Sequence, residues 1–243
     1  MSEKSTPSVF WILAAAVIPV INLAARFRVV DRDKFPLQGA CILAPNHYSE
    51  IDPLVVGALV WKLGRRPRFL AKASLFKNRI LGWALRASGQ IPVERAGSTR
   101  GSEPLKAARE LVEKGQLVIV YPEGTLTRDP DLWPMRGKTG AVRLAFAGEI
   151  PVIPVATWGV QEILPRYGKL RFWPPRRRVQ VLLGPAVDLD RFRSAGSSAL
   201  PAATDAVMAD IAQLLAQLRG EPAPAQRWNP SDHGQKETGR LEP

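Results

Sequence analysis

The chain has 243 residues, of which 46% are hydrophobic, so it can bury a sizeable core and is not globally disordered. Its 34 basic and 22 acidic residues give a formal net charge of +12, which favours an anionic partner: nucleic acid, a phosphorylated substrate or an acidic lipid surface. A single cysteine excludes an internal disulfide, and the two histidines leave no His/Cys cluster with the spacing of a structural zinc site.

The first feature along the chain is an apolar segment from Val9 to Ala25 that contains no charged residue. As a straight helix it would be about 27 Å long, just enough to span the hydrocarbon core of a bilayer, and Pro19 would kink it. The basic residues that follow would keep the next domain cytoplasmic. We therefore expect residues 1–30 to form a membrane-inserting helix, spanning or monotopic, at the cytoplasmic face of the cell membrane. A signal peptide and a core helix docked on the domain are the alternatives.

Residues 31–220 alternate short apolar segments with longer amphipathic ones, which predicts one domain. The short segments are rich in Val, Ile or Leu and predict strands at 41–44, 69–71, 91–93, 117–121, 152–157 and 179–183. The longer segments predict helices at 54–63, 80–88, 102–114, 139–147 and 202–218. Apolar strands between helices predict an α/β fold with a mixed, largely parallel sheet flanked by helices. Residues 221–243 are polar and predict a disordered tail.

The first candidate site is the segment 46–53, which lies between a predicted buried strand and a predicted helix. On an α-helix, His47 and Asp52 would lie about 140° apart and could not pair. Pro53 favours a helix that begins there, so we predict Asp52 as the N-cap and a tight turn before it. Such a turn can fold the carboxylate onto one imidazole nitrogen and leave the other free to accept a proton. The alternative is a histidine at a helix start with satisfied hydrogen bonds and no chemical role.

The second candidate is the segment 121–125, where a predicted strand ends in a turn at the edge of the sheet that commonly binds ligands. Gly124 permits close approach to the backbone, and exposed N–H groups with the Thr125 hydroxyl can hold phosphate oxygens. An ordinary loop with a glycine is the alternative.

Two further segments are less specific. In residues 89–95 a predicted strand leads to Arg95, a side chain suited to bidentate binding of phosphate, unless it is simply a solvated surface residue. The apolar, proline-flanked segment 150–155 would be scaffold or a wall against an acyl chain.

In order and spacing, the segments NHYSEIDP, GQIPVER, YPEGT and IPVIPVA resemble the four sequence blocks of the glycerophospholipid acyltransferases, and in particular of the bacterial 1-acyl-sn-glycerol-3-phosphate acyltransferases. The resemblance covers roughly residues 27–183. One departure is Pro92-Val93-Glu94 in the second block, where the family often has a bulkier apolar residue and Asp before the arginine.

The resemblance implies transfer of a fatty acyl chain from a thioester to the free hydroxyl of 1-acyl-glycerol 3-phosphate, which gives phosphatidic acid for phospholipid synthesis. The donor would be acyl-coenzyme A or acyl carrier protein, and we expect neither a metal nor a cofactor. By this likeness His47 is the general base and Asp52 orients it. The acceptor phosphate would be held by Arg95 with Glu123, Gly124 and Thr125, and further phosphate candidates are Lys72, Arg136 and Lys138.

Glu123 is an unusual residue to hold an anion directly, so we expect its carboxylate to orient Arg95 or a neighbouring base. Cys41, in a predicted buried strand, is expected to pack as a small apolar residue and not to carry an acyl group.

Basic and aromatic residues are predicted to form a rim that contacts an anionic membrane surface. These residues are Arg65, Arg66, Arg68 and Arg176 to Arg178, with Trp61, Trp83, Trp158 and Trp173. Unrelated solvated loops and core tryptophans are the alternative.

Other functions stay open at this point. The acceptor could instead be glycerol 3-phosphate, a lysophospholipid or a glycolipid, and a catalytically silent membrane-surface protein is a further alternative. No nucleic-acid partner is expected, because the sequence has no zinc-finger, basic-zipper or aromatic RNA-binding signature. A serine hydrolase is disfavoured because no G-x-S-x-G turn is present.

Overall fold

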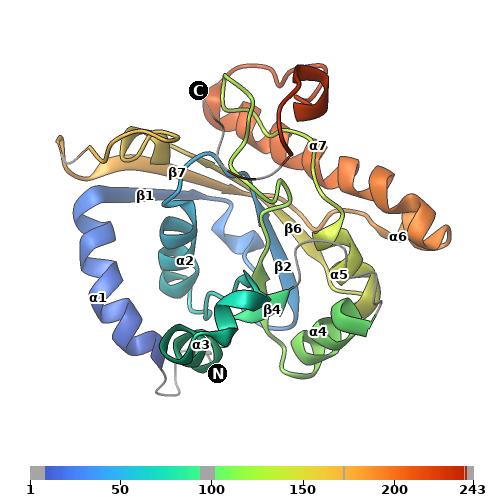
Figure 1. Ribbon diagram of the computed structural model, residues 1–243. Helices are drawn as coiled ribbons and strands as arrows, with labels where there is room; N and C mark the ends of the chain where they lie inside the picture. The colour runs from blue at the N-terminus through green and yellow to red at the C-terminus, as the bar shows by residue number, and fades with distance from the viewer. Residues whose placement is uncertain (1–8, 94–101, 172, 238, 240–243) are drawn as a thin grey trace.

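The computed structural model describes residues 9–93, 102–171, 173–237 and 239. A five-stranded sheet runs through the centre of the molecule with helices on both of its faces (Figure 1). The strand order is β1 (Ala25–Val30), β7 (Arg177–Leu183), β6 (Val152–Trp158), β2 (Cys41–Pro45) and β5 (Leu117–Ile119). A separate parallel pair is formed by β3 (Leu70–Lys72) and β4 (Ile91–Val93).

The sheet is mixed, and the expectation of a largely parallel sheet is wrong. Strands β1 and β7 run in one direction, and β6, β2 and β5 run in the other, because β6 and β7 pair antiparallel while the remaining neighbours pair in parallel. The physical reason lies in the connection from β6 to β7. A parallel pair needs a crossover, usually a helix, whereas the described part of this connection holds only the single-turn 3₁₀ helix Val160–Glu162.

The helices fall where the amphipathic pattern predicts them. They are α2 (Asp52–Lys62), α3 (Arg79–Ala87), α4 (Ser102–Glu113), α5 (Gly140–Gly148) and α7 (Leu200–Arg219). The short helix α6 (Asp190–Arg193) was not predicted. All the predicted strands and helices are present, with ends displaced by at most two residues.

The two faces of the sheet support two cores. Because side chains alternate along a strand, Cys41 and Leu43 face α2, whereas Ile42 and Ala44 face α4, α5 and α7. All four are buried, which explains why β2 has a continuous apolar sequence. The sheet thereby holds the carboxyl ends of β2 and β5 side by side.

The N-terminal apolar segment forms α1 (Val9–Ala24), a helix of 16 residues and therefore about 24 Å in length. Phe10 and Ile21 are buried against the domain, whereas Ile12, Val20 and Leu23 are each more than 60% exposed. The helix thus docks through one face, as a core helix would, and leaves an apolar face open.

Within the described part of the chain, one stretch, Gly196–Arg219, is long and apolar enough to cross a membrane, and 56% of its most apolar window is buried. Its helix α7 packs on the sheet and contributes Val207, Met208 and Ile211 to the core, so we assign this stretch to the domain interior. The apolar helix Phe10–Ala24, counted over the described residues alone, is shorter than the length that such a span requires.

Two segments have a structure that differs from the one predicted from the sequence. Ala25–Val30, expected to flank a membrane helix, forms edge strand β1, because its apolar residues alternate with Arg26 and Arg28 at the period of a strand. Residues 221–237, expected to be a disordered tail, fold back onto the domain and contain the 3₁₀ helix Pro230–His233.

The predicted basic rim is only partly at the surface. Arg65 is fully buried and Arg68 is 5% exposed, whereas Arg176 and Arg178 are exposed on and beside β7. Arg65 donates hydrogen bonds to the carbonyl oxygens of Pro36 (3.0 Å) and Gly115 (2.7 Å), so it joins two loops that are distant in sequence. Trp61 is buried against α1, whereas Trp83 and Trp173 are 62% and 82% exposed.

We predict that Arg65→Met lowers the free energy of unfolding by about 2–3 kcal/mol, because two partly buried carbonyl groups lose a charged donor. Denaturant titration followed by circular dichroism measures this change. Arg178→Met, on the exposed face of β7, is the matched control and should change stability by less than about 0.5 kcal/mol. Equal effects of the two substitutions would contradict a structural role for Arg65.

Candidate active site

The site begins where β2 ends and the side chain of Asn46 continues the pairing of the strands. The Asn46 Nδ2 group donates to the carbonyl oxygen of Thr157 (3.1 Å), and the Thr157 backbone N–H donates to Asn46 Oδ1 (2.8 Å). Both residues are buried. The amide therefore joins β2 to β6 one residue beyond Pro45, and it sets the direction in which the chain enters the turn at His47.

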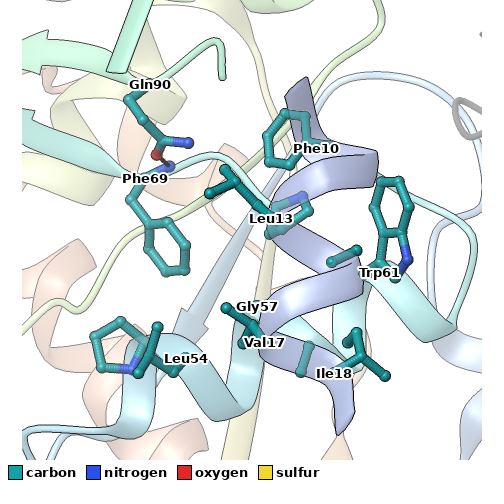
Figure 2. A pocket seen from close by; sticks show the side chains of 13 residues that line it. Phe10, Leu13, Val17, Ile18, Leu54, Gly57, Trp61, Phe69 and Gln90 are labelled. Carbon is teal, nitrogen blue, oxygen red and sulfur yellow. Dashed lines mark hydrogen bonds between the residues drawn. The ribbon is translucent and has the colours of Figure 1, made fainter. Parts of the chain in front are cut away.

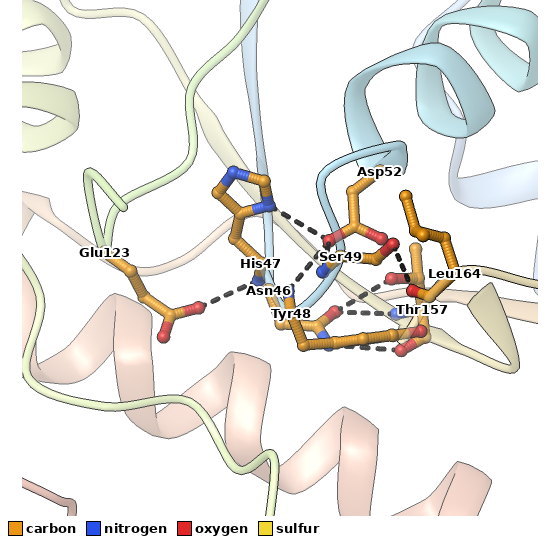
Figure 3. Close-up of polar contacts among 8 residues, drawn as sticks. All are labelled: Asn46, His47, Tyr48, Ser49, Asp52, Glu123, Thr157 and Leu164. Atoms are coloured by element: carbon orange, nitrogen blue, oxygen red, sulfur yellow. Dashed lines mark hydrogen bonds and ion pairs between the residues drawn. The ribbon is translucent and has the colours of Figure 1, made fainter. Parts of the chain in front are cut away.

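A single carboxylate oxygen organises this turn (Figure 3). Asp52 Oδ2 accepts hydrogen bonds from the backbone N–H groups of Tyr48 (2.8 Å) and Ser49 (2.8 Å), and it lies 3.0 Å from His47 Nδ1. The predicted pairing of His47 with Asp52 is therefore present in the structure.

The position of Asp52 at the helix start differs by one residue from the prediction. Ile51 occupies the N-cap position and makes no side-chain cap bond, and Asp52 is the first residue of α2. The carboxylate does not cap its own helix, because it turns back and satisfies the N–H groups of the preceding turn.

These contacts determine the tautomer of the imidazole. Since Asp52 Oδ2 already accepts two backbone N–H groups, it acts as an acceptor toward His47, and Nδ1 carries the proton. Nε2 then presents its lone pair on the opposite side of the ring, away from Asp52 (Figure 3). The His47 side chain is 15% exposed and that of Asp52 is fully buried. Burial raises the pKa of Asp52, and the hydrogen bond and charge of His47 act in the opposite direction.

The backbone of His47 is held from the other side by the loop that follows β5. Its N–H donates to Glu123 Oε1 (2.9 Å), and its carbonyl oxygen accepts from the Thr127 N–H (2.6 Å). The second oxygen of Glu123 accepts from the Met135 N–H (3.1 Å). The side chain and the backbone of His47 are thus fixed by separate partners.

Both Glu123 oxygens accept backbone N–H groups in the part of the chain that the structure describes. The expectation that its carboxylate orients Arg95 or a neighbouring base stays a prediction. Complete burial raises the pKa of Glu123 to about 8, although its hydrogen bonds with Met135 and His47 partly offset this effect. Arg95, which Glu123 was expected to orient, lies outside the described residues.

Of the other predicted phosphate residues that the structure describes, all but Lys72 lie in the loop between β5 and α5. Gly124 has a φ of +70°, and a Cβ at that position would lie 3.0 Å from Lys138 Cδ, so the lysine side chain lies directly over the turn. Thr125 is partly buried beside it, and Arg136 is exposed. Lys72 lies in β3. No three His, Cys, Asp or Glu side chains within the described ranges form a cluster that could hold a metal ion.

The sequence analysis did not single out two buried tyrosines of the site, of which one contacts the imidazole and the other packs on a tryptophan. The Tyr121 ring lies 4.2 Å from the His47 ring, centroid to centroid, and Tyr48 packs edge-on against Trp158. Both hydroxyl groups are buried and have no hydrogen-bond partner among the described residues. Tyr121 directly precedes the Pro122-Glu123 pair, and this adjacency was the available signal.

An apolar cavity of about 180 Å³ lies between α1 and α2 (Figure 2). Side chains spaced three and four residues apart on each helix form its walls, which is the periodicity of a single helical face. On α2 these are Pro53, Leu54, Gly57, Ala58 and Trp61, and on α1 they are Phe10, Leu13, Ala14, Val17 and Ile18. Phe69, Pro67 and Gln90 complete the lining.

The raised pKa of Glu123 predicts a pH dependence of stability. The unfolded chain loses this proton near its ordinary value of 4.5, whereas the folded chain keeps it to about 8. Between these values the folded state binds more protons, so the free energy of unfolding should fall as the pH rises from 5 to 8, by at most about 1.4 kcal/mol per pH unit. Denaturant titrations at several pH values measure this slope. Glu123→Gln should flatten it, and an unchanged slope would exclude Glu123 as its source.

Comparison with known proteins agrees with this geometry. The sequence pattern described as the acyltransferase family matches residues 26–158. A 1-acyl-sn-glycerol-3-phosphate acyltransferase of Bacillus subtilis is 27% identical over 83% of this chain and 94% of its own length. A chloroplastic protein of Brassica napus with the same name is 33% identical over 51% of this chain, which spans only 35% of that relative.

A solved structure shares the fold. The crystal structure of the 1-acyl-sn-glycerophosphate acyltransferase of Thermotoga maritima has a TM-score of 0.61 and 22% identity, and the match covers 91% of this chain and 81% of that one. The family pattern includes all of β2, the His47–Asp52 turn and the Glu123 turn, and it matches more than half of the sequence. The chain therefore belongs to the acyltransferase family.

Proposed function

We propose that this chain transfers a fatty acyl group from a thioester to the free hydroxyl of 1-acyl-glycerol 3-phosphate and so produces phosphatidic acid. The observation that carries the proposal is the 3.0 Å contact between His47 Nδ1 and Asp52 Oδ2, which turns Nε2 away from the carboxylate as a free base. The names of the Bacillus and Brassica relatives support the choice of acceptor.

In the proposed reaction, His47 Nε2 removes the proton of the acceptor hydroxyl as its oxygen attacks the thioester carbonyl carbon. The buried Asp52 carboxylate stabilises the imidazolium that forms. The tetrahedral intermediate expels the thiolate, which takes the proton from the imidazolium, and the products are an ester and a free thiol. A thioester already has a good leaving group, so positioning and proton transfer are sufficient and no covalent enzyme intermediate is needed.

The apolar cavity is the proposed site of the acyl chain of the donor. Its walls contain no charged side chain, and they include Pro53, the residue that follows Asp52 in the sequence. Along α2 the lining runs from Pro53 to Trp61, a rise of about 12 Å. A thioester held at His47 could therefore extend its hydrocarbon chain between α1 and α2. The two candidate donors, acyl-coenzyme A and acyl carrier protein, carry the same hydrocarbon chain and differ in the group that bears the thiol.

We place the protein at an anionic membrane surface, at the cytoplasmic face. The exposed face of α1 carries Ile12, Val20 and Leu23, and the loop before β7 presents Trp173 with Arg176 beside it. Apolar and aromatic side chains next to cationic ones suit the interface of an anionic membrane.

His47→Ala should lower the rate at least about 100-fold, because the general base is lost. The assay is thiol release from palmitoyl-coenzyme A, with and without 1-acyl-glycerol 3-phosphate. Cys41→Ala is the control and should retain activity, because the Cys41 thiol is buried at the opposite end of β2 from His47.

Each outcome of this assay has a distinct meaning. Release that needs the acceptor and is lost in His47→Ala supports the transferase. Release without an acceptor indicates a thioesterase. No release with any acceptor and with either donor would contradict an enzymatic role, and loss of activity in a folded Cys41→Ala protein would overturn direct transfer.

The cavity predicts a change in donor preference. A Cβ at Gly57 would lie 3.5 Å from the Phe69 ring and 3.6 Å from Pro67 Cβ, so alanine fits there and a larger side chain fills the cavity. Gly57→Leu should lower kcat/KM for palmitoyl-coenzyme A relative to octanoyl-coenzyme A about tenfold. Gly57→Ala, the matched control, should change this ratio little. An unchanged ratio in a folded Gly57→Leu protein would exclude this cavity as the acyl site.

A further inference from the structure

The C-terminal segment 221–237, here called the strap, lies against the loop that follows β5, at the end of the sheet where His47 is found. Figure 1 shows the strap, in red, beside α7. The strap lies outside the residues that match the acyltransferase family. Its contacts lead by a short series of hydrogen bonds to the catalytic histidine.

The strap is folded on itself and tied to α7. Arg227 forms an ion pair with Asp205 of α7 at 2.6 Å. The Trp228 indole stacks on the His233 ring at a centroid distance of 3.5 Å, and its Nε1 donates to Gln235 Oε1 (3.1 Å). The indole thus packs against the rest of the strap, which fixes the position of the Trp228 carbonyl group.

That carbonyl group holds the loop next to Glu123. The Arg136 N–H donates to the Trp228 carbonyl oxygen (2.9 Å), and the N–H of the preceding residue, Met135, donates to Glu123 Oε2 (3.1 Å). The other oxygen, Oε1, accepts the N–H of His47 (2.9 Å). Three hydrogen bonds therefore connect the strap to the backbone of the catalytic residue.

The strap also closes the space behind Glu123. A polar cavity of about 230 Å³ has Glu123, Met135 and Lys138 on one side and the strap residues Asn229 and Glu237 on the other. The Lys138 ammonium group donates to the carbonyl oxygen of Glu237 (3.3 Å). Displacing the strap would open this cavity to water and hydrate a carboxyl group that is now fully buried.

The loop has little space in which to adjust. A Cβ at Gly137 would lie 2.7 Å from Met208 Cγ on α7, so the backbone there is in close contact with the helix. The Lys138 N–H donates to the carbonyl oxygen of Pro122 (2.7 Å). Residues 135–138 are therefore held between the Glu123 turn, α7 and the strap, and a shift on one side is passed to the other.

We propose that the strap is a positioning element of the active site and that Trp228 is its positioning residue, acting on His47 through Arg136, Met135 and Glu123. The effect on turnover rests on the proposed acyl transfer. The mechanical link is independent of it and can be measured without any substrate.

The test compares full-length Trp228→Ala, which loses the stack on His233, with Trp228→Phe, which keeps an aromatic ring. Ser231→Ala, an exposed strap residue whose hydroxyl bonds only within the strap, is the control. For each protein we measure amide hydrogen exchange at Arg136, Met135 and His47. We also measure kcat, both KM values and thermal unfolding.

In Trp228→Ala we expect faster amide exchange at Arg136, Met135 and His47, and a kcat lowered about 10- to 100-fold with both KM values changed less than about twofold. Trp228→Phe should restore most of the kcat. Unchanged exchange at His47, or a loss of activity that follows the lowered thermal stability and is not restored by phenylalanine, would overturn the proposal. If the wild-type protein transfers no acyl group, the proposed function fails, and the exchange at His47 still decides the link.

Discussion

The carboxylate of Asp52 is the group on which the geometry of the site depends. One of its oxygens accepts two backbone N–H groups and contacts His47 Nδ1, so the same atom shapes the turn and orients the imidazole. Pro53 favours a helix that begins here, and full burial keeps water from competing for the carboxylate. Without this group, the turn would lose its internal acceptor and the histidine its orientation.

The rest of the fold serves to hold this turn in place. Strand β2 delivers His47, the Asn46 amide ties it to β6, and Glu123 and Thr127 from the loop after β5 bind its backbone. These partners meet because parallel strands present their carboxyl ends at one edge of the sheet. Helix α2 contributes Asp52 at its first residue and the wall of the apolar cavity along the next turns, so one helix links the base to the proposed acyl site.

Much of the site could be predicted because its determinants are local in sequence. The spacing of His47, Asp52 and Pro53 was enough to predict the turn, although the N-cap was displaced to Ile51. In β1, apolar residues alternate with arginines. This pattern was not recognised as a strand, because the arginines resemble the basic flank of a membrane helix. The sheet was predicted to be mixed, but the antiparallel pairing of β6 with β7 could not be predicted, since strand direction depends on how a connection packs and not on the strand sequence.

Contacts between residues far apart in the sequence could not be predicted from sequence patterns. Nothing local indicates that the Asn46 side chain pairs with Thr157, that Arg65 is buried between two loops, or that the polar C-terminal segment folds back on Arg136. A polar segment is disordered only when it makes too few contacts with the rest of the chain to offset the entropy cost of ordering it. Here an ion pair to α7, a ring stack and backbone hydrogen bonds supply them.

The most direct test of the account is the protonation of the two His47 ring nitrogens in the resting protein. Nitrogen-15 NMR of histidine-labelled protein gives it, with His233 assigned by substitution. If Asp52 orients His47, the ring carries a proton at Nδ1 and none at Nε2, and this preference is lost in Asp52→Asn. A ring protonated at Nε2 in the wild-type protein, or a preference unchanged in Asp52→Asn, would contradict the claim that Asp52 prepares His47 as the base.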